Sequence, residues 1–199
     1  MRKKIQKLLL AQGLLILLIP TLPVSSQTEQ RVCPYVDEPP SQTTRVARLD
    51  RLGVEVTIPS NYRTMLRQDG SVEILDPATF TLFECMSRGG IGQGGGYYSQ
   101  SIALEPRDQS MSFREQAIWS VGSSIDSSGH HLPIVRSIQS YKWHGYSGYI
   151  VLSQSGYSAT LMVQMPSDEQ VLTMAVGCDC EVELEDVISL SESVKPIAR

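Results

Sequence analysis

The sequence lacks the motifs that build the common catalytic and metal sites. It has only three histidines in 199 residues. No Gly-x-Ser-x-Gly segment marks a nucleophile elbow. The glycine-rich segment 89–96 lacks the Lys-Ser/Thr of a phosphate-binding loop, and the acidic run 179–186 lacks EF-hand spacing. These absences argue against an α/β-hydrolase, a P-loop nucleotide-binding protein and an EF-hand calcium protein.

Basic residues are scarce beyond the first 26 positions. Those positions hold four of the 17 basic residues and none of the 21 acidic ones, so the rest of the chain has 13 against 21, a formal net charge of −8. An acidic surface repels phosphate backbones and anionic lipid headgroups. We therefore expect neither nucleic-acid binding nor attachment to an anionic membrane.

The N-terminus reads as a cleavable signal peptide over residues 1–26. Met1–Lys7 is short and basic, and Leu8–Leu22 is almost wholly apolar. Val24 and Ser26 then stand three residues and one residue before the expected cut, where signal peptidase accepts small side chains. No cysteine directly follows the apolar run, which argues against a lipoprotein.

An uncleaved membrane anchor is the alternative reading of this segment. Its apolar run of about 15 residues is shorter than the roughly 20 that span a bilayer, and Pro20 interrupts the end. No later apolar segment is long enough to span. The sequence thus predicts an exported, soluble protein in a periplasmic, lumenal or extracellular compartment, with no stable membrane insertion after cleavage.

Four cysteines follow the leader: Cys33, Cys85, Cys178 and Cys180. An even number in an exported chain predicts two disulfides. Because a bond between near neighbours in a strand is strained, we expect Cys33 and Cys85 each to pair with one of Cys178 and Cys180. A thiolate metal site at the Cys-Asp-Cys triplet is the alternative.

Periodicity predicts an α+β fold in one domain over residues 46–199, after an extended, proline-rich arm at 27–45. Leu52–Ile58 alternates as a strand, and Asp69-Gly70 joins two further strands in a hairpin. Asp76-Pro77 and Ser112 to Glu115 carry the capping signals of two helices. Residues 123–133 read as a polar loop.

The C-terminal part reads as an antiparallel meander of four strands. Apolar residues alternate from Ile134 to Cys178, and a helix over Glu181–Val194 closes the chain. Acidic residues in its first turns suit the positive end of the helix dipole.

This order of elements resembles the PsbP/DcrB-like α/β/α sandwich over roughly residues 46–197. Val56–Tyr62 is similar to the opening strand and turn of those domains, and the meander and last helix complete the likeness. The resemblance implies a single antiparallel sheet with helices packed on its faces. It also implies an exported binding or accessory domain without catalysis. The glycine segment and the four cysteines depart from the pattern.

Three groups of side chains are candidate sites. His130 and His131, with Asp126 nearby, could hold a divalent metal together with His144 or with Cys178 or Cys180. Two solvated loop histidines are the reading that we favour. Ser147 and Ser158 follow Gly-Tyr but lack the setting of a hydrolase nucleophile.

The third group is aromatic and suits either a binding patch or a sheet interior. Its members are Tyr141, Trp143, Tyr146 and Tyr149. We expect an exported, non-enzymatic binding protein with a protein partner and no cofactor. Its alternatives are a metal-binding protein and, last, a small hydrolase.

Overall fold

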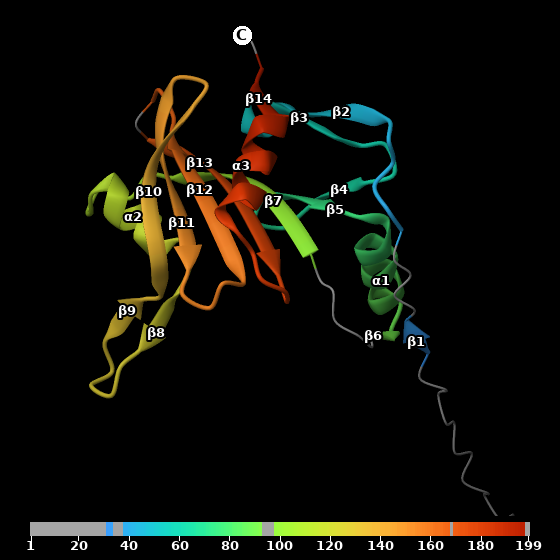
Figure 1. Ribbon diagram of the computed structural model, residues 1–199, viewed down its shortest axis with the longest axis horizontal. Coiled ribbons are helices and arrows are strands. Elements are labelled where there is room, and N and C mark those ends of the chain that lie inside the picture. Colours follow the sequence, from blue (N-terminus) through green and yellow to red (C-terminus); the bar gives the residue numbers. More distant parts are fainter. Residues whose placement is uncertain (1–30, 34–37, 93–97, 168, 198–199) are drawn as a thin grey trace, which may run out of the picture.

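The computed structural model describes residues 31–33, 38–92, 98–167 and 169–197, so the expected signal peptide lies outside the described residues. The largest element is an antiparallel sheet of seven strands (Figure 1). The order across it is β10 (Val135–Trp143), β11 (Tyr146–Ser153), β12 (Ser158–Gln164), β13 (Gln170–Cys178), β7 (Tyr98–Pro106), β5 (Val72–Leu75) and β4 (Arg63–Leu66). The predicted meander is confirmed as β10 to β13.

The expectation of a single sheet is wrong. β14 (Val194–Pro196), β3 (Val54–Pro59) and β2 (Thr44–Leu49) form a separate three-stranded sheet, with the 3₁₀ turn η1 (Asp50–Leu52) between β2 and β3. Two further sheets have two strands each: β1 (Val32–Cys33) with β6 (Ile91–Gly92), and β8 (Ser123–Ile125) with β9 (His131–Pro133). Pairing between remote segments leaves no periodic trace in a sequence, which is why alternation alone did not separate the sheets.

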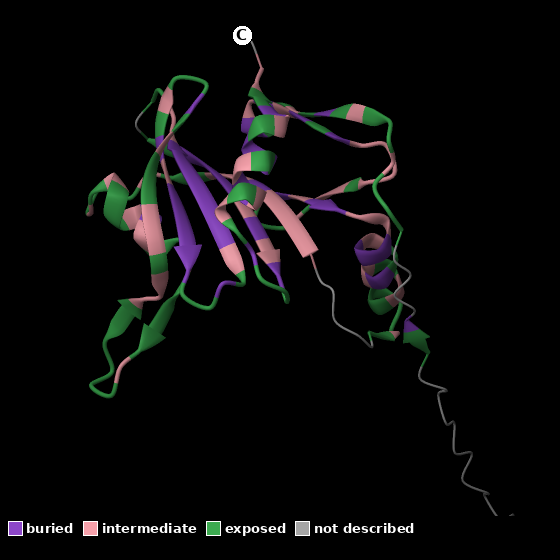
Figure 2. Ribbon diagram, in the orientation of Figure 1, coloured by how far each residue is buried: buried purple, intermediate pink, exposed green. Residues whose placement is uncertain are grey.

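The C-terminal helix α3 (Leu184–Ser193) lies between the two larger sheets. It packs on β11, β12 and β13 on one side and on β3 and β14 on the other. Val187 of α3, Val56 of β3 and Met174 of β13 have no exposed surface. Figure 2 shows this burial concentrated in the inner strands. The main hydrophobic core is therefore shared by both sheets and the helix.

Helix α3 begins three residues later than its sequence pattern predicts. Glu183 and Asp186 form a reciprocal capping box, in which the Glu183 N–H donates to Asp186 Oδ2 at 2.8 Å. The preceding loop is held instead by the Val182 N–H, which donates to Gly156 O at 2.7 Å.

The opposite face of the large sheet carries the short helix α2 (Phe113–Trp119). Its predicted capping box is confirmed. The Glu115 N–H donates to the Ser112 hydroxyl, and the Ser112 N–H donates to the Glu115 carboxylate. Ala117 of α2 packs on Val151 and Met162 in a second, smaller apolar cluster. The sheet is thus covered on two faces by different helices.

The third helix, α1 (Pro77–Ser87), confirms the signal at Asp76, whose carboxylate accepts from the Thr79 N–H at 2.8 Å. The hairpin at Asp69-Gly70 is also confirmed, with Gly70 at φ 88°.

Two segments differ from the sequence prediction. Residues 123–133 form the β8–β9 hairpin, where a loop was expected, and Thr44 and Arg45 of the expected arm belong to β2. The paired strands satisfy backbone groups that a loop would leave to water.

Candidate functional site

The structure does not bring the candidate metal ligands together. His130 and His131 lie in the β8–β9 hairpin, and His144 lies in the turn after β10, where its Nε2 is 3.1 Å from Val194 O. The His130 ring pairs with Asp126 at 3.7 Å, while His131 Nδ1 lies 3.2 Å from Ser123 Oγ. Within the described residues, no three side chains of His, Cys, Asp or Glu are grouped closely enough to hold a metal ion.

The expected disulfide pairing is wrong, although all four cysteines are bonded. Cys33 joins Cys85, and Cys178 joins Cys180. Cys33 reaches Cys85 because β1 pairs with β6, directly after α1, and this brings the arm beside the helix. The Cα atoms of both pairs lie within the usual range, at 5.7 Å and 5.0 Å. Both sulfurs of the Cys-Asp-Cys triplet are therefore occupied.

The four aromatic residues do not share one surface. Trp143 is only 3% exposed, and its indole N–H donates to Ser191 O of α3 at 2.9 Å. Tyr141 and Tyr146 pack against the same main core. Tyr149 points to the opposite face, where its ring lies 5.5 Å from that of Phe113. Successive residues of a strand alternate between faces, which separates Tyr146 from Tyr149.

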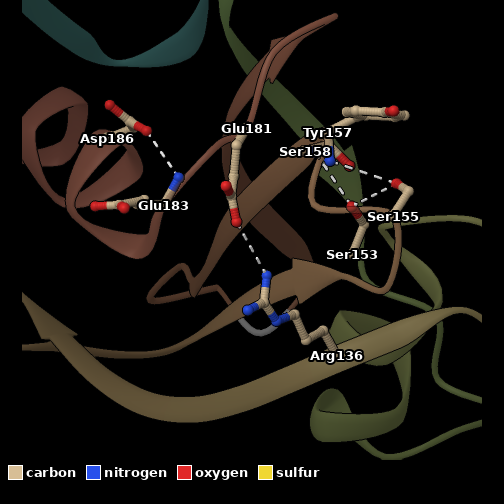
Figure 3. Close-up of polar contacts among 8 residues, drawn as sticks. All are labelled: Arg136, Ser153, Ser155, Tyr157, Ser158, Glu181, Glu183 and Asp186. Atoms are coloured by element: carbon tan, nitrogen blue, oxygen red, sulfur yellow. Dashed lines mark hydrogen bonds and ion pairs between the residues drawn. The ribbon is translucent and has the colours of Figure 1, made fainter.

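The candidate nucleophile Ser158 begins β12, directly after a turn held by hydroxyl groups (Figure 3). Its N–H donates to Ser153 Oγ at 3.2 Å, and Ser153 Oγ lies 3.1 Å from Ser155 Oγ. Ser147 is exposed in β11, opposite Lys142. Each serine is placed by sheet or turn geometry, and neither follows a strand into a helix.

An open groove with a volume of about 460 Å³ lies beside α2. It is formed by the start of α2 and the ends of β10, β11 and β12. Its lining residues are Ser112, Phe113, Arg114, Ser140, Tyr141, Lys142, Ser147, Gly148, Tyr149 and Gln164. We call it the Arg114–Lys142 groove.

The groove is cationic in an acidic chain. Arg114 and Lys142 are exposed, and no acidic residue is among the described residues that line it. The nearest acid in sequence, Glu115, is held in the capping box by Ser112. Hydrogen bonds with the Ser112 side chain and backbone lower the pKa of Glu115 and so favour its ionised form. That carboxylate is engaged at the start of α2.

Two aromatic rings form the base of the groove, and Arg107 contacts one of them. Phe113 and Tyr149 stack at a tilt, and the Arg107 guanidinium lies 5.7 Å from the Phe113 ring centre. Arg107 also donates to Gln116 Oε1 at 2.9 Å and Met111 O at 2.8 Å. The groove thus offers two cations and hydroxyl groups above an aromatic base, which suits an acidic extended segment.

Alternation along β10 carried a sequence signal for this groove that was missed. Tyr141 and Trp143 point to the main core, so Ser140 and Lys142, which alternate with them, must face the other side. Arg114 had no such signal, because its place beside β10 depends on how α2 packs.

Two titratable groups of β7 are perturbed but do not form a site. Burial raises the pKa of Tyr98, and it raises the pKa of Glu105 against the opposing influence of the Thr173 hydroxyl. The Thr173 hydroxyl lowers the pKa of Glu105, although it forms no hydrogen bond of normal geometry. Tyr98 and Glu105 lie near opposite ends of β7 and on opposite faces.

A second hollow of about 320 Å³ lies between the arm and α1. Its polar groups bond one another: the Asn61 amide donates to Glu38 Oε1 and to Pro39 O, both at 3.0 Å. These bonds tie the arm to the body of the protein.

None of the helices in the described part of the chain is both long and apolar enough to cross a membrane.

Comparison with known proteins gives structural neighbours only. No protein-family description and no curated protein matches the sequence. Similar solved structures include the Ran-binding protein Mog1p of Saccharomyces cerevisiae, with 6% identity, a TM-score of 0.41 and coverage of 79% of this chain and 97% of that one. They also include PsbP (CyanoP) of Synechocystis sp. PCC 6803, with 9% identity, a TM-score of 0.43 and coverage of 82% of this chain and 96% of that one. The second belongs to the group that the order of elements in this sequence resembles.

Proposed function

We propose that this chain is an exported, non-enzymatic accessory protein that binds an acidic, extended segment of a protein partner in the Arg114–Lys142 groove. The observation that carries the proposal is the pair of exposed cations above Phe113 and Tyr149, in a groove whose described lining holds no acid. Basic side chains over an aromatic base match a segment that alternates acidic and apolar residues.

The two cations set specificity more than affinity. An exposed ion pair contributes only about 0.2–1 kcal/mol. Because the chain beyond residue 26 has a net charge of −8, the groove is a local exception to a surface that repels acidic partners. Arg114 and Lys142 therefore determine where an acidic segment docks and in which register.

Main-chain bonding at β10 supplies the affinity that the charges lack. β10 is the outermost strand of the large sheet, and in the part of the chain described only β11 pairs with it. An extended segment can add to such an edge by backbone hydrogen bonds. Ser140 and Lys142 would then lie beside it, next to the groove.

The proposal of export draws on the leader at residues 1–26 and on the cysteines. Two disulfides in one small protein are typical of oxidising compartments. N-terminal sequencing of the protein recovered from the exporting cell tests this directly: a start at Gln27 supports export with cleavage, and a start at Met1 contradicts it.

Site-specific cross-linking tests the groove. A photoreactive residue at Ser140, with the chain expressed in its own cells, should capture a partner through a peptide that can be sequenced. Lys142→Glu and Arg114→Glu should lower the yield at least about tenfold when combined. The matched control is Lys195→Glu, an exposed lysine on β14.

The sequence of the captured peptide decides the assignment. An acidic segment supports the proposal. A basic or wholly apolar segment, or capture that is unchanged by the two charge reversals, contradicts it.

A further inference from the structure

The two disulfides differ in what they hold together. Cys33–Cys85 spans 52 residues, whereas Cys178–Cys180 spans two. A disulfide stabilises a fold chiefly by restricting the unfolded chain, and the effect grows with the length of the closed loop. Breaking the short link therefore removes little restriction. Stability of the fold does not explain why Cys178 and Cys180 are joined.

The two disulfides also differ in access. Cys33 is 1% exposed, so a thiol cannot approach it without local opening, and its partner Cys85 is half-buried in α1. Cys180 is an exposed residue in the loop between β13 and α3, while its partner Cys178 is 8% exposed and belongs to the main core. An incoming thiolate must approach one sulfur along the disulfide axis and expel the other. Exposure selects Cys180 as the attacked atom and Cys178 as the leaving atom.

The leaving sulfur is already hydrogen-bonded. The Cys180 N–H donates to Cys178 Sγ at 3.1 Å. A backbone N–H on sulfur stabilises a developing thiolate. Cys178 Sγ also lies 3.9 Å from Asp179 Oδ1, which can accept a hydrogen bond from the thiol once Cys178 is protonated. The Cys180 N–H therefore favours the leaving thiolate, whereas the Asp179 carboxylate opposes that charge and favours prompt protonation to the thiol.

The surrounding structure does not depend on the bond. The Cys178 N–H donates to Tyr157 O at 3.0 Å, and Cys178 is paired with Tyr98 at the end of β13. The Val182 N–H bonds to Gly156 O, and Glu181 pairs with Arg136 at 3.6 Å (Figure 3). These contacts hold both sides of the loop in place, so we expect the reduced form to keep the fold of the oxidised one.

We propose that Cys178–Cys180 is a thiol–disulfide exchange site that accepts electrons from a dithiol protein. One partner thiolate attacks Cys180 Sγ, which forms a mixed disulfide and breaks the Cys178–Cys180 bond. Cys178 leaves as a thiolate and takes a proton from solvent. The second partner thiolate then attacks its own chain's sulfur in the mixed disulfide and releases Cys180, which is also protonated. The partner loses two electrons and gains a disulfide, and Cys178 and Cys180 become thiols.

This site is separate from the Arg114–Lys142 groove. Cys178 lies near Tyr157, directly before β12, whereas the groove includes Gln164 at the end of that strand. Failure of either proposal therefore leaves the other standing.

Selective reduction tests the site on the processed, fully oxidised chain. The protein is treated with dithiothreitol in native buffer, quenched with acid, alkylated and mapped by mass spectrometry. Cys178 and Cys180 should be alkylated at least about tenfold faster than Cys33 and Cys85. Equal rates, or faster reduction of Cys33–Cys85, overturn the proposal.

A second measurement tests which sulfur is attacked. Limited reduced glutathione, followed by acid quenching, should leave the mixed disulfide on Cys180; an adduct only on Cys178 overturns the mechanism. The control is the double variant Cys178→Ser with Cys180→Ser. It should keep the circular dichroism spectrum and the reduction rate of Cys33–Cys85, and loss of either shows that the bond is structural and also overturns the proposal.

Discussion

Gly148 shows how one missing side chain shapes the groove. It is buried in β11 opposite Val163 of β12, and a Cβ at this position would lie 2.5 Å from Met162 O. No real Cβ tolerates that distance, and the obstacle is backbone of the neighbouring strand. The close approach of β11 and β12 beside the groove therefore depends on glycine.

We predict that Gly148→Ala lowers the free energy of unfolding by about 1–3 kcal/mol, the usual cost of overpacking a well-packed site. Urea denaturation followed by circular dichroism measures it. Gly177→Ala in β13 is the matched control, since its nearest non-neighbouring atom to a new Cβ is Ser99 Oγ at an ordinary 3.6 Å. Equal losses in the two variants contradict the argument.

Glu115 stabilises the start of α2, a helix of only seven residues that borders the groove. Its pKa is lowered in the fold by hydrogen bonds with Ser112. A depressed pKa means that the stabilising effect is complete above the unfolded-state value, near 4.5, and is lost as the pH falls through the folded-state value.

Glu115→Gln should therefore destabilise the protein more at pH 6 than at pH 3. The glutamine oxygen still accepts from the Ser112 N–H, so the variant isolates the charge. Urea midpoints at the two pH values, for wild type and variant, give the comparison. A gap between them that is the same at both pH values would show that the charge of Glu115 does not support α2.

The disulfides make a second prediction at the scale of elements. Replacing Cys33 and Cys85 by serine releases β1 and β6 from α1 and should cost about 4 kcal/mol by the loop-entropy relation. The same change at Cys178 and Cys180 should cost about 1.5 kcal/mol. Denaturant unfolding of both double variants measures the difference. Costs in the reverse order would refute the loop-entropy account.

Local signals in the sequence predicted the elements well. Asp76 and Ser112 mark helix starts through bonds within one turn, and alternation marks β10 to β13. The pairing of remote segments was not predictable in this way. Nothing near Val194 signals that it pairs with Val56, and nothing near Cys33 signals that β6 brings Cys85 to it.

The groove, too, was predictable where it depends on local alternation and not where it depends on packing between remote segments. The inward side chains of Tyr141 and Trp143 imply an outward Lys142, which alternation can give. The position of Arg114 depends on the packing of Ala117 on Val151 of β11 and Met162 of β12, which are the fourth and fifth elements after α2. Only part of a groove formed by a helix and three strands can therefore be predicted from the sequence.

The whole molecule should unfold as one unit, because the main core joins both sheets through α3. Val56 in the small sheet and Leu161 in the large one are fully buried in that core. If the sheets were independent, a cavity in one would leave the other unchanged. A shared core instead makes its loss destabilise both together.

Val56→Ala should lower stability by about 1–3 kcal/mol and shift one common transition. Far-ultraviolet circular dichroism reports all the strands, and Trp143 fluorescence reports the contact of β10 with α3. The two curves should coincide in wild type and variant. Val46→Ala in β2 is the control in the same sheet, since Val46 is 56% exposed and should change little. Separate transitions, with only one moved by Val56→Ala, would mean that the three-stranded sheet folds independently of the large one and that residues 46–199 are not a single domain.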